Sequence, residues 1–327
     1  MAMFISLNNQ LIKTMIKLNR FLAIVFVGLI STNIKAQLTT GNEQFFFNPV
    51  MVNPALAGMH NNQISLGYDT RWLGIDGAPR TGFINYDRMF NDNTGWNVAV
   101  ISDQIGPING YSIANSFSFK VQTSEETKLA FGLRHNLTQT FLNVNSSKLI
   151  DPTDLLLAAD QTGVPVNNFD ASVAWMNPNS FMIGFSYRNL IPQPRFRFTN
   201  TDIQPVLSVQ GWYTRDFGEA SIEAFGLLST TSNTYINTNL GAMAAFQHKV
   251  GLGINFSPKN QLGVFTYIKL NEKLNVYYNY NFPLSEINKV SKQSHGVGIS
   301  FRLGKASPGG TTFFLQPSDD NVRTRMF

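Results

Sequence analysis

The sequence has no cysteine among its 327 residues, and only 14% of its residues are charged. The absence of cysteine excludes disulfide bonds, thiolate metal sites and cysteine nucleophiles at once. A soluble domain ordinarily has about a quarter of its residues charged, so an ordinary soluble surface is not expected here. The formal net charge is +5 with a pI near 9.3, but the basic residues are scattered along the chain. We therefore expect no nucleic-acid partner.

Long hydrophobic runs are also lacking. Hydrophobic residues make up 43% of the chain, yet the mean hydropathy is -0.08, so apolar residues are diluted among polar ones. The one candidate block, Phe21 to Ile30, is too short for a membrane-spanning helix, which needs about 20 apolar residues. Lys13, Lys17 and Arg20 precede the block. This order favours a secretory signal peptide over residues 1–36, with a buried core helix as the alternative.

What the sequence does have is period-2 alternation, which dominates beyond residue 62 and indicates strands whose two faces meet different environments. From Val250 to Phe256, for example, apolar side chains alternate with glycine and asparagine. The strand lengths centre near the 9 to 11 residues that a tilted strand needs to cross a bilayer. The fold class predicted is all-β, a transmembrane outer-membrane β-barrel over residues 63–303. The alternation places fourteen antiparallel strands at 63–72, 80–89, 95–102, 111–122, 127–138, 168–176, 180–189, 204–215, 219–228, 234–246, 249–257, 261–270, 273–282 and 294–303.

The connections between these strands are alternately long and short. Bacterial barrels have short periplasmic turns and longer external loops, so this alternation predicts that both chain termini are periplasmic. Three of the longer loops, 139–167, 190–203 and 283–293, are expected to form an external surface for a partner. The longer class is predicted at 73–79, 103–110, 139–167, 190–203, 229–233, 258–260 and 283–293.

Six basic residues share the polar face of the predicted strands. An arginine facing lipid at the bilayer midplane would cost about 2–4 kcal/mol, so this face is expected to line the interior. Two interpretations remain open: a basic lumen that attracts anions or an acidic peptide, or an internal network paired with Asp69, Asp170 and Glu223. The six residues are Arg71, Lys120, Arg134, Arg188, Lys269 and Arg302.

Residues for catalysis or metal binding are not brought together by any spacing in the sequence. The four histidines, which are His60, His135, His248 and His295, do not show the spacing of a zinc site. Many serines are present, but no pattern joins one to a histidine and a carboxylate. We therefore expect no enzyme activity, no cofactor and no metal.

The segment before the first strand is unusually aromatic. Phe45 to Phe47 are consecutive, and the Asn-Pro pairs at Asn48 and Asn53 punctuate the chain as turns. Three adjacent phenylalanines require burial, and no soluble domain is expected to provide it. Residues 37–62 are therefore predicted to form a plug-like segment that packs on or in the barrel, and residues 304–327 a C-terminal tail.

Three motifs that occur in order carry a resemblance to a known family. Together they resemble the PorP/SprF family of type IX secretion system membrane proteins across essentially the whole mature chain, although the tail runs past the point where many members end. The matching residues are Asn48, Pro49, Asn53, Pro54, Ala55 and Gly58, then Arg71, Trp72, Gly77 and Pro79, and then Gly106 and Pro107.

The resemblance implies an outer-membrane barrel of Bacteroidetes-type bacteria. Such a barrel works with a cognate large surface protein, often an adhesin with a type IX sorting domain, in its secretion or attachment, and some members serve gliding motility. The other expected partners are further type IX components and the lipid bilayer with its lipopolysaccharide. A rival interpretation is a transport channel for hydrophobic solutes, because Asn53-Pro54-Ala55 also resembles the N-terminal hatch of the fatty-acid transporter family.

Overall fold

The structure is a computed structural model that describes residues 45–60, 62–143, 160–194, 202–231, 235–247, 249–258, 260–291 and 293–303. The expected signal peptide, residues 37–44 and the tail at 304–327 lie outside the described residues. So does most of the expected loop at 139–167.

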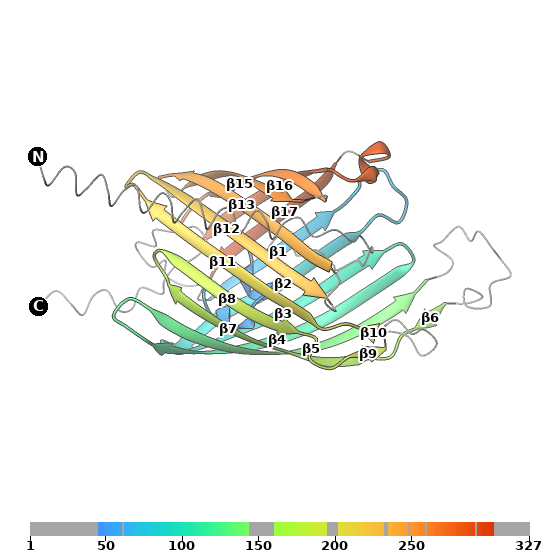
Figure 1. Ribbon diagram of the computed structural model, residues 1–327, viewed down its shortest axis with the longest axis horizontal. Coiled ribbons are helices and arrows are strands. Elements are labelled where there is room, and N and C mark those ends of the chain that lie inside the picture. Colours follow the sequence, from blue (N-terminus) through green and yellow to red (C-terminus); the bar gives the residue numbers. More distant parts are fainter. Residues whose placement is uncertain are drawn as a thin grey trace, which may run out of the picture. The chain divides into compact units, whose positions relative to one another are not determined.

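Fourteen long antiparallel strands close into a barrel, as the alternation predicts (Figure 1). Each strand pairs with the next along the chain, and β1 pairs with β17 over its whole length to close the sheet. The strands are β1 (Gln63–Thr70), β2 (Arg80–Asn91), β3 (Thr94–Ile105), β4 (Ile108–Gln122), β5 (Lys128–Leu142), β7 (Val166–Asn177), β8 (Phe181–Arg188), β11 (Val206–Asp216), β12 (Ala220–Thr231), β13 (Tyr235–Phe246), β14 (Val250–Ser257), β15 (Gln261–Lys269), β16 (Leu274–Pro283) and β17 (Ser294–Arg302).

Three short strands lie outside this series. β6 (Gln161–Thr162) pairs with the end of β5, while β9 (Gln193–Pro194) pairs with β10 (Asp202–Ile203). We call the end of the barrel that holds the β1–β2 connection the loop end, and the opposite end the turn end.

The two faces of the barrel differ as expected for strands between lipid and an enclosed interior. Large apolar side chains on the outer face are exposed, and Leu252 and Ile254 of β14 are 68% and 59% exposed. The intervening positions of the same strand are buried. This alternation confirms the all-β outer-membrane barrel predicted from the sequence.

Several strand ends differ from the prediction. The expected loop at 103–110 is wrong: β3 and β4 continue toward each other until only Gly106 and Pro107 connect them. β5 runs past residue 139 to Leu142, and β1 ends at Thr70, before Arg71 and Trp72. Polar residues end the hydrophobic pattern, but they do not end backbone pairing when the neighbouring strand continues, and this explains the longer strands.

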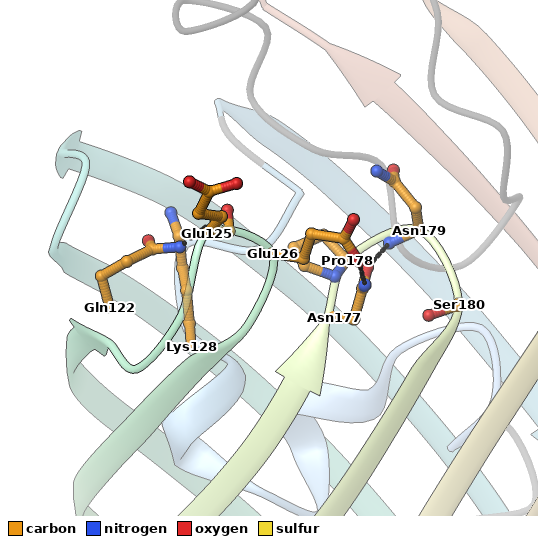
Figure 2. A pocket seen from close by; sticks show the side chains of 8 residues that line it. All are labelled: Gln122, Glu125, Glu126, Lys128, Asn177, Pro178, Asn179 and Ser180. Carbon is orange, nitrogen blue, oxygen red and sulfur yellow. Dashed lines mark hydrogen bonds between the residues drawn. The ribbon is translucent and has the colours of Figure 1, made fainter.

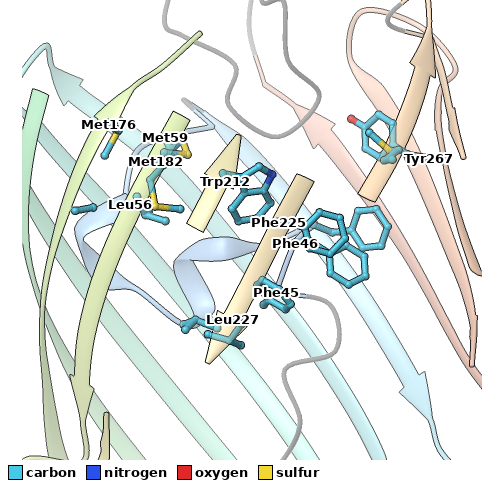
Figure 3. Packing of buried hydrophobic residues seen from close by; sticks show 14 of the residues in the cluster. Phe45, Phe46, Leu56, Met59, Met176, Met182, Trp212, Phe225, Leu227 and Tyr267 are labelled. Carbon is cyan, nitrogen blue, oxygen red and sulfur yellow. The ribbon is translucent and has the colours of Figure 1, made fainter. Parts of the chain in front are cut away.

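A segment that we call the plug (Phe45–His60) is buried inside the barrel. It contains two 3₁₀ turns, η1 (Pro49–Met51) and η2 (Pro54–Leu56), each begun by an asparagine followed by a proline. Its apolar side chains join buried residues of the barrel wall in one cluster, shown in Figure 3. The core of this protein is therefore inside the barrel. Among the described residues, no helix is long and apolar enough to cross a membrane.

Candidate functional site

The polar wall formed by β2–β5 and β7 binds the plug mainly through its backbone. Both carboxylate oxygens of Asp87 on β2 accept hydrogen bonds from plug amides, one from Gly58 N and one from His60 N, each 2.8 Å long. Asp87 is 1% exposed, so these bonds form away from water. A buried carboxylate needs such donors, because an unpaired charge in this environment is costly.

Basic side chains bind the carbonyl groups of the plug. Lys120 Nζ donates to Ala57 O at 2.7 Å, and Arg134 donates to the carbonyls of Val50 and Met51. Arg134 also lies 3.5 Å from Asp170 as a buried ion pair. The Arg134–Asp170 pair belongs to the internal network that the sequence offers as one interpretation. In addition, two of the interior cations bind the protein's own plug.

The two Asn-Pro units fix the path of the plug. Asn48 Nδ2 donates to Asn85 Oδ1 on β2 at 3.1 Å. The side chain of Asn53 caps η2 by accepting from Ala55 N at 3.0 Å, and that same amide donates to Ser172 Oγ on β7 at 2.8 Å. Proline fits the first position of each turn because its missing N–H has no partner to lose there.

Glycines on the inner face let the plug backbone touch the wall. Gly58 itself has a positive φ of 78°, and a Cβ there would lie 2.6 Å from Gly95 Cα. The space for a side chain on these wall glycines is taken up by the plug. A Cβ built on Gly95 would collide with Ala57, one on Gly132 with Ala55, and one on Gly184 with Asn53.

The opposite wall, formed by β11–β16, is aromatic. Phe46 packs against Phe225 and Phe265 with ring centroids 4.7 Å apart in each case, and Phe47 stacks on Tyr277 at 4.0 Å. Each of these wall rings pairs across the sheet with a glycine, as Phe225 does with Gly241. The rings lie over the space that the glycines leave, and they pack against the phenylalanines of the plug.

One titratable group of the plug lies outside the strands. Burial lowers the pKa of the His60 imidazole below its ordinary value, and the nearby Asp87 carboxylate partly opposes this effect. His60 is 8% exposed, and this burial favours the neutral form of its imidazole. No three His, Asp or Glu side chains of the described segments gather as a metal site.

The remaining family-motif residues meet at the loop end. Gly106 N donates to Gly77 O at 2.8 Å, and both glycines have positive φ values. Arg71 N donates to Pro79 O within the same connection, and Trp72 N donates to Ser294 Oγ of β17. Pro107 O accepts from Asn143 N. The twelve motif residues thus form two groups, one in the plug and one at the loop-end rim.

The other predicted interior cations lie near the ends of strands. Arg188 and Arg302 occupy the inward phase at the last positions of β8 and β17. Lys269 pairs with Glu272 at 3.0 Å beside the turn after β15. Arg71 follows β1 rather than lying within it. Asp170 interacts electrostatically with both Arg188 and Arg134, so these two cations share one carboxylate.

A cleft of about 480 Å³ lies at the turn end between the β4–β5 and β7–β8 turns (Figure 2). Glu125, Glu126 and Lys128 contribute to its lining, and Asn177 Nδ2 donates to Glu126 Oε2 at 3.1 Å. The cleft is open, and it is lined mainly by polar and charged residues of the two turns, as is usual for turns in contact with water. The plug and the loop-end rim are better candidates for function.

Sequence reasoning missed the wall residues that bind the plug, which are Asp87, Ser118, Ser172, Gly95, Gly132 and Gly184. Asp87 lies in a strand that alternates poorly, so the sequence does not predict that its side chain faces inward. The glycines and Ser172 look like small lumen-facing residues. Only the position of the plug gives them a role.

Comparisons with known proteins identify the family of the chain. A family model described as "Type IX secretion system membrane protein PorP/SprF" matches residues 34–301. The chain belongs to this family. The match includes both groups of motif residues and the barrel strands up to Phe301 of β17, and it confirms the resemblance found in the sequence.

Solved structures similar to this PorP/SprF family member are outer-membrane barrels. The Acinetobacter baumannii outer-membrane protein Omp33 is 11% identical with a TM-score of 0.46, over 75% of this chain and 100% of that one. A Pseudomonas aeruginosa FadL homologue is 11% identical with a TM-score of 0.46, over 80% and 94%. The NanC porin is 10% identical with a TM-score of 0.40, over 74% and 99%. These likenesses concern the fold alone. No curated protein matches the chain.

Proposed function

We propose that this PorP/SprF family member is a non-enzymatic outer-membrane scaffold that assists the secretion or surface attachment of one cognate large surface protein, such as an adhesin. Its loop end would face outward and its chain termini would be periplasmic. The partner would carry a type IX sorting domain, and a role in gliding motility would follow where that partner is a motility adhesin.

One observation carries this proposal: the lumen is occupied by the protein's own plug. Phe45, Phe46 and Leu56 are 0% exposed, and they pack against the aromatic wall. On the other side, charged groups of β2, β4 and β5 are bound to the plug backbone. An interior occupied by the plug favours a function at the ends of the barrel over transport through its lumen.

The test is the surface proteome of a deletion strain. We expect one large surface protein to disappear from the cell surface, while uptake of a hydrophobic solute such as oleate stays unchanged. Complementation with the wild-type chain should restore that protein. An unchanged set of surface proteins would refute the scaffold.

A transport function remains the second candidate, because the plug resembles a hatch in its Asn-Pro motif and the wall beside it is apolar. This function requires the plug to move. It predicts the opposite result from the same strain, namely normal surface proteins together with defective uptake.

A further inference from the structure

Two arginines and one carboxylate form a row across the inner wall at the loop end. Arg188 is the last residue of β8, and its side chain lies in the inward phase of that strand. β8 pairs with β7 up to Tyr187 opposite Ala171, so the next position brings Arg188 beside Asp170. On the other side of β7, Asp170 pairs with Arg134 of β5. The carboxylate therefore lies between the two cations.

The carboxylate of Asp170 is already engaged by other donors. Its Oδ1 accepts a hydrogen bond from the Asn189 amide at 2.9 Å. Its Oδ2 accepts one from Asn136 Nδ2 at 3.0 Å and lies 3.5 Å from Arg134 Nη1. Arg188 interacts with this carboxylate electrostatically, but no hydrogen bond joins these two described residues. Asp170 thus leaves the hydrogen-bond donors of Arg188 to another acceptor.

The two arginines differ in the partners that the protein supplies. Arg134 donates from Nε to Ser116 Oγ at 2.8 Å, from Nη1 to Met51 O at 2.8 Å, and from Nη2 to Val50 O. The plug therefore satisfies Arg134. Arg188 Nε, in contrast, is buried and has no hydrogen-bond partner in the part of the chain that the structure describes. A buried donor of a charged group is costly when it lacks an acceptor, so an acceptor that a ligand brings is stabilising there.

The charge of this row defines the chemical class of that ligand. Two guanidinium groups and one carboxylate leave an excess of one positive charge, and the ligand that matches it is an anion. A guanidinium presents its N–H groups as a planar fork, which fits the two oxygens of a carboxylate. Arg188 as a whole is half-buried, so the rest of its side chain can be reached from the lumen.

The position of Arg188 limits how an anion can arrive. The side chain faces the interior, so lipid headgroups outside the barrel do not reach it. Gly184, one turn-end-ward stretch of the same strand, lies against Asn53 of the plug, so Arg188 is on the loop-end side of the plug. A small solute bound there would meet the plug beneath it, whereas a protein docked at the loop end can insert an acidic side chain.

We infer that Arg188 is the anchor of an anion-binding site at the loop-end opening of the lumen, and that its ligand is a carboxylate side chain of the partner polypeptide. The inference rests on the proposed function and locates one of its contacts. It also divides the interior cations: Arg134 belongs to the internal network and holds the plug, while Arg188 attracts an external anion.

The test in cells compares two arginines of the loop end. Arg188→Gln should lower the surface display of the protein that the deletion strain lacks by about tenfold, because it removes a charge-assisted contact. Arg188→Lys keeps the charge without the planar fork and should give an intermediate level. The matched control is Arg80→Gln, since Arg80 is exposed in the outward phase at the loop end of β2. This control should keep wild-type display.

A direct binding measurement uses the purified full-length barrel in lipid nanodiscs, with hexaglutamate as the probe and hexaglutamine as its neutral counterpart. Wild type and Arg80→Gln should prefer hexaglutamate, and Arg188→Gln should lose about tenfold in affinity for it. Hydrogen exchange of the Ala55 amide, which donates to Ser172 on β7, should be the same in all three proteins. Faster exchange of this amide in Arg188→Gln would show that Arg188 supports the plug, and it would overturn the inference.

The possible failures are distinguishable. A deletion strain with unchanged surface proteins refutes the proposed function. Loss in the deletion strain with normal display in Arg188→Gln overturns only the anion site, and so does equal affinity of Arg188→Gln and wild type for hexaglutamate. Binding of inorganic sulfate at Arg188 without binding of hexaglutamate would identify a free anion as the ligand, and the carboxylate of a partner polypeptide would then be wrong.

Discussion

At the residue scale, a few wall side chains decide whether the plug stays in the lumen. Asp87 is the clearest, since it accepts both the Gly58 and the His60 amide. Asp87→Asn would turn one acceptor into a donor that faces an N–H group. Hydrogen bonds to charged groups contribute about 1.5–3 kcal/mol each. We therefore expect the free energy that holds the plug against the wall to fall by about 2–3 kcal/mol.

Hydrogen exchange of the Gly58 and His60 amides measures this effect. Both amides should exchange faster in Asp87→Asn, while amides in the middle of β14 should not change. The control is Asp92→Asn, which alters an exposed acidic residue in the turn between β2 and β3. Equal protection in Asp87→Asn and wild type would contradict the role given to this carboxylate.

A glycine on the same wall provides a second residue-scale prediction. A Cβ on Gly132 would collide with the backbone of Pro54 and Ala55, and overpacking of this kind typically costs about 1–3 kcal/mol. We expect Gly132→Ala to make the plug sensitive to protease in folded barrels. In Gly211→Ala the nearest backbone contact is 3.9 Å away, so this variant should remain resistant. Resistance in both variants would count against close plug packing.

The sequence predicts such residues poorly, because their partners are distant in the chain. Gly132 and Ala55 are far apart in sequence, and the period-2 pattern reports only that Gly132 faces inward. The alternation likewise predicts that Arg134 faces inward, but it does not predict the hydrogen bonds of Arg134 to the carbonyls of Val50 and Met51. Burial of Phe45 to Phe47 is readable from their chemistry, while the rings that receive them are not.

At the element scale, the β1–β2 connection should behave as a rigid unit. Gly77 has a φ of 72°, and a Cβ there would lie 3.0 Å from Gly106 Cα. Gly77→Ala should therefore separate the connection from the β3–β4 hairpin, in addition to backbone strain of about 1–2 kcal/mol. Faster exchange of the Gly106 amide, which donates to Gly77 O, is the direct measurement.

The matched control for that variant is Gly74→Ala. Gly74 also has a positive φ, 94°, but nothing lies within 4 Å of a Cβ built there. Gly74→Ala therefore introduces the same backbone strain as Gly77→Ala without a collision. The Gly106 amide should keep its protection from hydrogen exchange. The same exchange rate of the Gly106 amide in both variants would show that backbone strain, and not the contact between Gly77 and Gly106, determines how rigid the β1–β2 connection is.

Strands are the elements that the sequence predicts best. The alternation places the ends of each of the fourteen within a few residues of those in the structure, because each strand must keep one face apolar along its full length in lipid. The alternation does not predict where β3 ends and β4 begins, because outside the lipid band the pattern no longer constrains pairing. The conformation of the β1–β2 connection depends on contacts with β17 and the β3–β4 hairpin, which no local pattern contains.

At the scale of the whole molecule, the scaffold and transporter hypotheses differ in one property: whether the plug must move. The chain has no cysteine, so an introduced pair has no competing thiol within the chain. Asn48 on the plug and Asn85 on β2 touch through their side-chain amides at 3.1 Å. In Asn48→Cys/Asn85→Cys, a reducible methanethiosulfonate crosslinker would fix the plug to the wall. The control, Ser112→Cys/Thr138→Cys, joins β4 to β5 where the two hydroxyls lie 2.8 Å apart.

We expect the crosslinked plug variant to display the partner within about twofold of wild type, since a static plug loses nothing when it is held in place. The density of contacts supports this outcome, because moving the plug would expose its aromatic cluster and leave Asp87 and Arg134 without their backbone partners. A transporter would instead lose solute uptake when crosslinked and recover it after reduction, with the wall control unaffected. Display that fails in the crosslinked barrel and returns on reduction would mean that the plug moves during partner handling, and the lumen would then belong to the functional site together with the rim.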